Sequence, residues 1–202
     1  MKPLFRFLAV ALPLLLAACV PAPAIRLHGD ASLMHEQEAR EQALRGSEHW
    51  TLQGKLGVSN GKDGGSGTLT WTQNGDRYDF VLRGPITGRS FRLTGGPEGA
   101  LLEGLDGGPL RGPDAEALMQ RALGWEVPLG DLRAWVLGLR ADSGPAELSF
   151  GANRLPSLLQ QDGWSVDYRQ WDPVHQPPLP KIVFAGKGTY KVKLSIESWS
   201  FP

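Results

Sequence analysis

Cys19 is the only cysteine among the 202 residues, so its thiol has no partner for an intramolecular disulfide. Lys2 and Arg6 give the chain a basic start, an apolar stretch of residues 7–16 follows, and Ala17-Ala18 precede the cysteine. A basic start, a short apolar run and small residues at a cleavage point are typical of an export signal. The apolar run is shorter than the roughly 20 residues that cross a bilayer.

The Leu16-Ala17-Ala18-Cys19 tetrad resembles a bacterial lipobox, in which the thiol receives a diacylglyceryl group and the signal is cut before the cysteine. We therefore expect a signal peptide over residues 1–18 and a lipidated, Pro- and Ala-rich tether over residues 19–30. Three acyl chains on Cys19 would hold the protein stably on a membrane. Val20 stands where an aspartate would resemble an inner-membrane retention signal, so we expect the outer membrane, facing the periplasm. The alternative is a plain secretory signal with an incidental cysteine.

No other residues form a pattern suited to catalysis, a metal or a cofactor. None of the four histidines has a second ligand at metal spacing. The run Gly186-Lys187-Gly188-Thr189 superficially resembles a phosphate-binding loop but lacks the upstream glycine, so we expect a hairpin turn there. Ser143-Gly144 lacks the preceding glycine of a nucleophile elbow. We predict that the protein is not an enzyme and has no cofactor.

The bulk composition is that of one globular domain, which we place at residues 31–202. Lys and Arg number 21, and Asp and Glu also number 21. This balance leaves no basic excess of the kind that nucleic-acid binding requires. We expect a monomer.

Helical periodicity is found in three places. Residues 31–46 predict a helix whose weak apolar face includes Leu33, Gln37, Arg40 and Leu44. A second helix should open at Pro113-Asp114 and close at Gly124. A third should open at Asp131, because the apolar residues that follow are spaced as one helical stripe. These are Leu132, Trp135, Val136 and Leu139.

The rest of the domain alternates apolar and polar residues with period two, which predicts strands. Turn signals at Asn74-Gly75 and Asp162-Gly163, and a glycine-rich link at residues 61–67, separate them. We expect a mainly β fold of about eleven antiparallel strands, curled into an incomplete barrel with the short helices as a lid. The strands are expected near residues 50–58, 68–72, 78–82, 91–93, 100–104, 109–112, 148–150, 155–161, 164–168, 182–184 and 190–196.

The concave face of such a sheet and the inner face of the lid would enclose apolar side chains. A half-barrel of this size can hold a ligand cavity in its mouth. The alternative is that all these side chains pack into a solid core. The predicted cavity residues are Leu56, Leu69, Trp71, Phe80, Leu82, Phe91, Leu93, Leu118, Leu132, Trp135 and Val136.

Ile86 is a large apolar residue in a turn framed by Gly84, Pro85, Thr87 and Gly88. Loops of this composition lie on the surface. A single exposed aliphatic residue is ordinary on its own. The alternative is a membrane-inserting tip, since burial of one isoleucine side chain contributes roughly 1.5–3 kcal/mol.

These features together resemble the LolB family of outer-membrane lipoproteins. The resemblance rests on the lipobox, on residues 70–78, on the turn around Ile86, on residues 127–139 and on the closing strand. Its most specific part is the run Val127-Pro128-Leu129-Gly130-Asp131-Leu132-Arg133-Ala134-Trp135-Val136-Leu137-Gly138-Leu139, which joins a proline link to an amphipathic helix.

The resemblance implies an eleven-stranded incomplete barrel with a hydrophobic cavity for acyl chains. It also implies that the protein accepts acylated lipoproteins from the periplasmic carrier LolA and inserts them into outer-membrane lipid. A protruding loop with a hydrophobic tip helps delivery in the family, and this tip maps to Ile86, where leucine is common. A lipocalin-like lipoprotein that binds a free hydrophobic small molecule and a purely structural envelope lipoprotein are the alternative functions.

Overall fold

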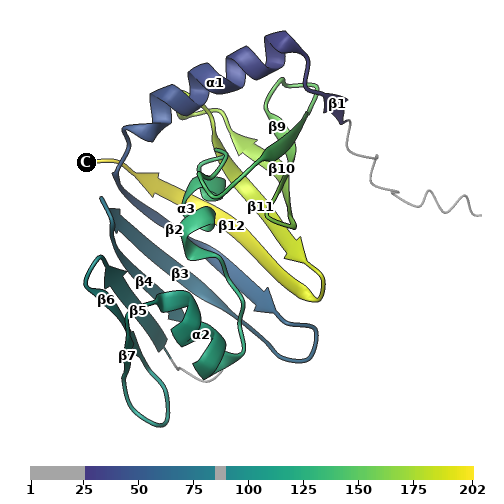
Figure 1. Ribbon diagram of the computed structural model, residues 1–202. Coiled ribbons are helices and arrows are strands. Elements are labelled where there is room, and N and C mark those ends of the chain that lie inside the picture. The colour runs from purple at the N-terminus through teal and green to yellow at the C-terminus, as the bar shows by residue number, and fades with distance from the viewer. Residues whose placement is uncertain (1–25, 85–89) are drawn as a thin grey trace, which may run out of the picture.

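A single antiparallel sheet dominates the computed structural model, which describes residues 26–84 and 90–202 (Figure 1). Within these residues the sheet has twelve strands, and every neighbouring pair is antiparallel. They are β1 (Leu27–His28), β2 (His49–Ser59), β3 (Gly64–Asn74), β4 (Arg77–Arg83), β5 (Ser90–Gly96), β6 (Gly99–Glu103), β7 (Leu110–Gly112), β8 (Ala146–Phe150), β9 (Pro156–Gln161), β10 (Trp164–Asp172), β11 (Leu179–Lys187) and β12 (Tyr190–Ser200).

The sheet is open, with β1 and β7 at its two edges in the order β1-β8-β9-β10-β11-β12-β2-β3-β4-β5-β6-β7. The predicted mainly β, incomplete barrel is therefore confirmed, with one strand more than the predicted eleven. The additional strand is the two-residue β1, in which Leu27 pairs with Phe150 and His28 with Ser149. It is too short for periodicity to reveal, and it lies within the segment that we assigned to the tether.

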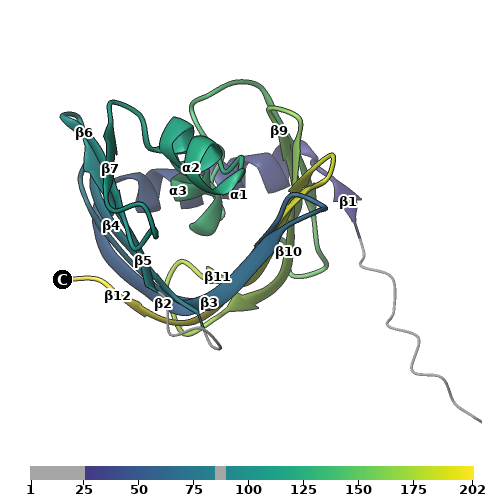
Figure 2. The ribbon, with the colours of Figure 1, turned by 90° about the horizontal axis from the view of Figure 1, so that it is seen from below.

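Three helices accompany the sheet: α1 (Ala31–Arg45), α2 (Ala115–Leu123) and α3 (Leu129–Val136). The chain passes from β7 at one edge of the sheet to β8 beside the other edge, and this crossover carries α2 and α3 over the concave face (Figure 2). The predicted lid therefore follows from the topology. No helix within the described ranges is long and apolar enough to cross a membrane.

Local signals explain the bounds of the lid helices. Asp114 caps α2 by accepting hydrogen bonds from two backbone amides of the first turn, and Gly124 ends α2 in the left-handed conformation, with φ of 67°. The helix α3 begins at Leu129, earlier than the predicted start at Asp131. Pro128 is the N-cap residue, with φ of −76° and a non-helical ψ of 86°, so the helix cannot extend further toward the N-terminus.

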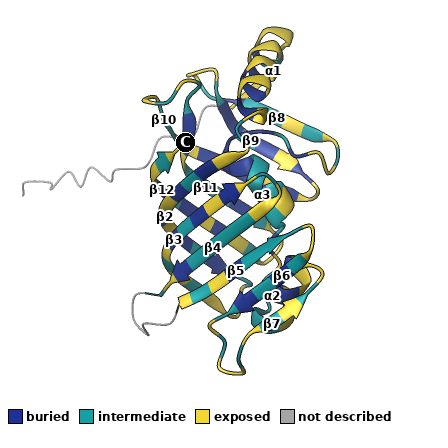
Figure 3. Cartoon of the chain, turned by 90° about the vertical axis from the view of Figure 1, so that its left-hand side faces the viewer, coloured by how far each residue is buried: buried dark blue, intermediate teal, exposed yellow. Residues whose placement is uncertain are grey.

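Buried residues alternate with more exposed ones along the strands (Figure 3), which gives the sheet one buried face and one more exposed face. In β2, Trp50, Leu52, Gly54, Leu56 and Val58 are buried, and the residues that alternate with them are less so. The turn signal Asp162-Gly163 forms the predicted hairpin between β9 and β10, with φ of 50° and 76°. Residues 187–190 also form the predicted hairpin, in which Lys187 pairs with Tyr190.

The predicted glycine-rich link between β2 and β3 is present but ends before residue 67, since Gly64 already belongs to β3 and pairs with Ser59. The glycines in this strand fit places where other groups come close. A Cβ atom on Gly67 would collide with the backbone carbonyl of Arg83. One on Gly65 would lie 3.0 Å from the indole of Trp125. A strand glycine often marks such a close approach.

Candidate apolar ligand cavity

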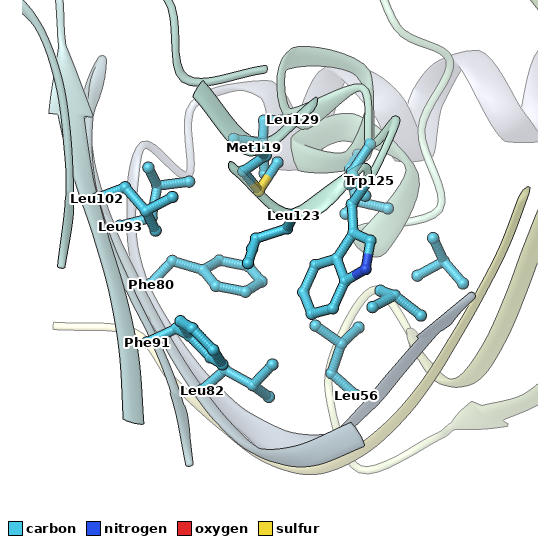
Figure 4. Close-up of a pocket in the computed structure, with 14 residues that line it drawn as sticks. Leu56, Phe80, Leu82, Phe91, Leu93, Leu102, Met119, Leu123, Trp125 and Leu129 are labelled. Carbon is cyan, nitrogen blue, oxygen red and sulfur yellow. The ribbon is translucent and has the colours of Figure 1, made fainter. Parts of the chain in front are cut away.

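A cavity of about 40 Å³ lies between the concave face of the sheet and the lid (Figure 4). Fourteen residues line it, and all of them have apolar or aromatic side chains. They are Leu56, Val58, Phe80, Leu82, Phe91, Leu93, Leu102, Met119, Leu123, Trp125, Val127, Leu129, Leu132 and Val192.

Period-two alternation aims the strand residues into this cavity. Phe80 and Leu82 on β4 lie two residues apart, as do Phe91 and Leu93 on β5, and Phe80 pairs directly with Leu93. From the opposite side, Leu123 at the end of α2 points toward Phe80 (Figure 4). The walls of the cavity therefore come from segments far apart in the sequence.

Trp125 lies in the link between α2 and α3, and its ring extends down toward Leu56 on the sheet (Figure 4). The ring is only partly buried. Gly65 lies close to the outer edge of this indole, where any larger residue would press on it. Trp125 therefore closes one side of the cavity.

Six of the predicted residues line the cavity, and five do not. The six are Leu56, Phe80, Leu82, Phe91, Leu93 and Leu132. The other five lie in the core outside the lining, each no more than 2% exposed: Leu69, Trp71, Leu118, Trp135 and Val136. Alternation and helical spacing identify the inward face, but they do not separate the residues beneath the cavity from those around it.

Trp71 and Trp135, two of the buried tryptophans, each donate a hydrogen bond to a glutamine side chain outside the cavity lining. Trp71 donates from Nε1 to Oε1 of Gln73 at 3.0 Å. Trp135 donates from Nε1 to Oε1 of Gln161 at 3.1 Å, and its backbone carbonyl accepts from the hydroxyl of Tyr168 at 3.0 Å. Trp135 therefore fixes α3 to β9 and β10.

Several lining residues were missed from the sequence, most of them on the lid. Trp125 and Val127 in the link between α2 and α3, and Leu129 at the start of α3, lie at every second position. That alternation is the signal that could have identified them, although the segment is not a strand. Leu123 lies four residues after Met119, which places both on one face of α2. Leu102 and Val192 were expected in strands but not at the cavity.

The helix α1 holds the C-terminal end of α3 through buried polar groups. Arg40 is 7% exposed, and its guanidinium donates to the carbonyl oxygens of Leu137, Gly138 and Pro178. Burial lowers the pKa of Arg40 to about 10, so the group still carries its charge at neutral pH. The guanidinium also lies over the ring of Trp171, 4.7 Å from its centroid.

Glu41, beside Arg40, is the second buried charge of α1. Arg140 donates to its two carboxylate oxygens from Nε and Nη2, at 2.8 Å each. Burial alone would raise the pKa of Glu41, but the hydrogen bonds from Arg140 and Gln37 keep it below its ordinary value. The weak apolar face predicted for residues 31–46 is thus a face with buried polar partners.

The cavity can exchange no hydrogen bond with a ligand, because its lining is apolar throughout. A cavity needs about 10–15 Å³ to hold one water molecule, so this one has room for a few waters and not for a fatty acyl chain. A larger ligand requires movement of the lid. Within residues 26–84 and 90–202, no group of three His, Cys, Asp or Glu side chains could hold a metal.

Cys19, Pro85, Ile86 and Thr87, which we predicted for lipidation and membrane insertion, lie outside the described residues. Gly84 follows β4 and Ser90 begins β5, so these two residues border residues 85–89, the predicted insertion segment. The predictions for these four residues remain predictions.

The open sheet with its covered concave face defines the class of protein, an incomplete antiparallel barrel with helices as a lid. A LolA superfamily protein from Nitrosomonas europaea superposes with a TM-score of 0.53 at 10% identity, covering 84% of this chain and 93% of that one. A DUF1329 family protein from Desulfovibrio piger gives a TM-score of 0.52 at 8% identity, covering 83% and 91%.

Sequence comparison gives the particular family: the chain belongs to the LolB family. Residues 48–199 match the family model described as outer membrane lipoprotein LolB. The outer-membrane lipoprotein LolB of Xanthomonas campestris pv. campestris (strain 8004) is 40% identical over 184 residues, covering 89% of this chain and 84% of the relative. That of Xylella fastidiosa (strain Temecula1) is 34% identical over 173 residues, covering 84% and 79%.

Family membership identifies the chain as an outer-membrane lipoprotein that takes part in lipoprotein localisation and is not an enzyme.

Proposed function

We propose that this protein accepts acylated lipoproteins from a periplasmic carrier of the LolA type, holds their acyl chains beneath its lid and releases them into the outer membrane. The observation that carries this proposal is the wholly apolar cavity between the sheet and the lid. A ligand suited to it has no polar group to satisfy, and hydrocarbon chains meet that condition.

The energetics of the cargo explain why such a cavity is needed. Three acyl chains carry on the order of 45 methylenes, and each methylene contributes ~0.8 kcal/mol on leaving water. The total of tens of kcal/mol excludes free diffusion between membranes. The sequence has no ATP-binding motif, so transfer must run downhill from the carrier, through this cavity, to the bilayer.

The contacts of the lid support a particular mode of opening. The C-terminal end of α3 is fixed by Arg40 and, through Trp135, by Gln161 and Tyr168. The link at Trp125 has a partly exposed ring and packs on the glycine-rich part of β3. Opening would therefore move α2 and the link while α3 stays in place.

A transfer experiment tests the proposal. The mature chain with Cys19→Ala is incubated with a purified carrier loaded with a labelled lipoprotein, and the label is followed after separation of the two proteins. Movement of the label onto this chain is the expected result. If the label stays on the carrier while the chain takes up a free fatty acid, the lipocalin-like function replaces the proposal.

A further inference from the structure

A hollow of about 550 Å³ lies on the convex face of the sheet, opposite the apolar cavity. Strands β10, β11, β12 and β2 form it, and Arg169, Phe184, Lys191 and Lys193 stand around it. We call this feature the convex groove. Lys191 and Lys193 flank Val192, whose buried side chain faces the concave side, so the two lysines project from the convex face.

Two glycines keep the convex groove open. Gly57 on β2 and Gly186 on β11 lie in its floor. A Cβ atom at Gly57 would meet no atom closer than 4.0 Å, and one at Gly186 none closer than 3.5 Å. Neither glycine has a positive φ. Packing and backbone conformation therefore both permit a side chain at these positions, and the hollow exists because none is present.

The charge of the convex groove is positive. Arg169 and Lys193 both lie over the ring of Phe184, with Cζ of Arg169 5.6 Å and Nζ of Lys193 5.2 Å from its centroid. Asp167 is the one acidic residue in the lining, and it already pairs with Arg169 at 2.6 Å and Arg26 at 3.2 Å.

The two lysines are available to a ligand. Both are exposed, and no ion pair is formed by Lys191 or Lys193 within residues 26–84 and 90–202. The groove and its rim therefore hold four positive side chains and one negative side chain. The positive ones are Lys191, Lys193, Arg169 and Arg26, and the negative one is Asp167.

The position of the convex groove relates it to a membrane. Cys19 precedes Arg26 by seven residues, a span of at most about 25 Å when fully extended. Arg26 contacts Asp167 at the rim of the groove. Strands β2 and β4 run in the same direction. Strand β2 ends at Ser59, which lines the groove, and β4 ends at Arg83, shortly before the predicted insertion segment in the sequence. The groove, Arg26 and the end of β4 thus lie toward one end of the sheet.

We propose that the convex groove binds the phosphate of anionic phospholipid headgroups in the membrane that anchors the protein. This inference rests on the proposed function, because it adds a lipid contact to the step in which cargo reaches the bilayer. Lys191, Lys193 and Arg169 supply the charge, and the glycine floor admits the headgroup between them. Two contacts, the lipid anchor and the groove, would set the orientation of the half-barrel on the membrane.

Vesicle binding tests this inference. The mature chain with Cys19→Ala is mixed with vesicles of phosphatidylcholine alone or with added phosphatidylglycerol, and the bound fraction is measured by sedimentation. We expect binding that requires phosphatidylglycerol and weakens with salt. A Lys191→Gln/Lys193→Gln variant should bind about 30-fold more weakly, since each basic residue near an anionic surface contributes a factor of about five.

Two further variants separate a site from general attraction. Arg111→Gln/Arg121→Gln removes the same charge from exposed positions on β7 and α2, and it should bind nearly as well as the parent chain. Gly57→Leu keeps every charge and fills the floor of the groove, and it should bind several-fold more weakly. Equal weakening by both double variants, or unchanged binding by Gly57→Leu, would overturn the groove as a headgroup site.

The outcome is independent of the acceptor function. If the chain takes cargo from the carrier but does not bind anionic vesicles, the groove inference fails and the proposed function stands. If the lysine variant binds vesicles normally and loses uptake from the carrier, the groove is a protein-docking surface, which also overturns the inference.

Discussion

Gly65 on β3 lies directly against the outer edge of the Trp125 indole, so that a Cβ atom at position 65 would be 3.0 Å from Cη2 and Cζ2. Gly65 has no positive φ, so its backbone conformation does not require glycine. The missing side chain instead leaves room for the indole of Trp125. The fit between these two residues holds the link of the lid on the sheet.

Gly65→Val should displace the indole of Trp125 and loosen the lid. We expect a loss of about 1 kcal/mol in the free energy of unfolding from overpacking, together with faster uptake of a fluorescent fatty acid. Stopped-flow fluorescence measures the uptake rate, and urea denaturation measures the stability. In a Trp125→Ala background the same substitution should have little effect, because the group it displaces is gone.

Gly57→Ala is the matched control, since its Cβ meets nothing closer than 4.0 Å on the neighbouring strand. It should leave the uptake rate unchanged. If Gly57→Ala and Gly65→Val change uptake equally, contact with Trp125 is not the cause.

Leu123→Glu should weaken acyl binding while the fold remains. Leu123 is partly buried and lines the cavity at the end of α2, so a carboxylate there would lose its water when a hydrocarbon chain enters. We expect at least about tenfold weaker binding of a fluorescent fatty acid, equivalent to 1.4 kcal/mol. Gln120→Glu, on the exposed face of the same helix, introduces the same charge and should bind normally.

Ile86→Glu should separate cargo acceptance from cargo release. A charged tip is costly to place in lipid, whereas Ile86 would gain roughly 1.5–3 kcal/mol by burial. The variant should accept labelled lipoprotein from the carrier and fail to pass it to vesicles, as measured by flotation. Ile86→Leu preserves the apolar tip and should release normally. Normal release by Ile86→Glu would exclude the membrane-inserting role.

The sheet could be predicted because each of its strands except β1 carries its own signal. Where one face of a strand is buried, apolar residues alternate with polar ones, as at Leu148 and Phe150 or at Val192 and Leu194. The turn at Asp162-Gly163 is marked by its own two residues and needs no other part of the sequence. Two residues of β1 could not be found, since their only support is pairing with Phe150 and Ser149.

The cavity could be predicted only in outline. Alternation shows that Leu69 and Leu82 both face inward, and Leu69 pairs with Leu82 across the strands, yet only Leu82 reaches the cavity. The difference depends on which lid residues cover each position. Buried polar pairs such as Trp135 with Gln161 join segments 26 residues apart, and no local pattern predicts them.

Arg40→Met should destabilise the protein because it removes the donor that holds three backbone carbonyls. The backbone carbonyl oxygens of Leu137, Gly138 and Pro178 would each lose a buried, charged hydrogen-bond donor. We therefore expect a loss of about 3 kcal/mol in the free energy of unfolding. Arg45→Met, at the exposed end of the same helix, should cost less than about 1 kcal/mol. Urea denaturation of the two variants checks the difference, and equal losses would contradict it.

Glu41→Gln should remove part of the acid sensitivity of the fold. Although burial acts to raise the pKa of Glu41, the bonds from Arg140 and Gln37 lower it below 4.5 in the folded protein. A carboxyl group with a lowered folded pKa contributes stability above its unfolded pKa, and that contribution is lost as the pH falls through the folded value. At neutral pH we expect Glu41→Gln to lose about 2 kcal/mol, since Arg140 loses a charged partner.

The pH profile distinguishes this origin from a simple packing defect. Between pH 7 and about 5 the stability difference between the parent chain and Glu41→Gln should stay constant, because Glu41 is ionised in both states. Below pH 4.5 the difference should shrink, because the parent chain alone loses the contribution of this carboxylate. Glu38→Gln, exposed on the same helix, should keep the parent profile. A difference that stays constant down to pH 3 would show that Glu41 stabilises α1 by its shape and not by its charge.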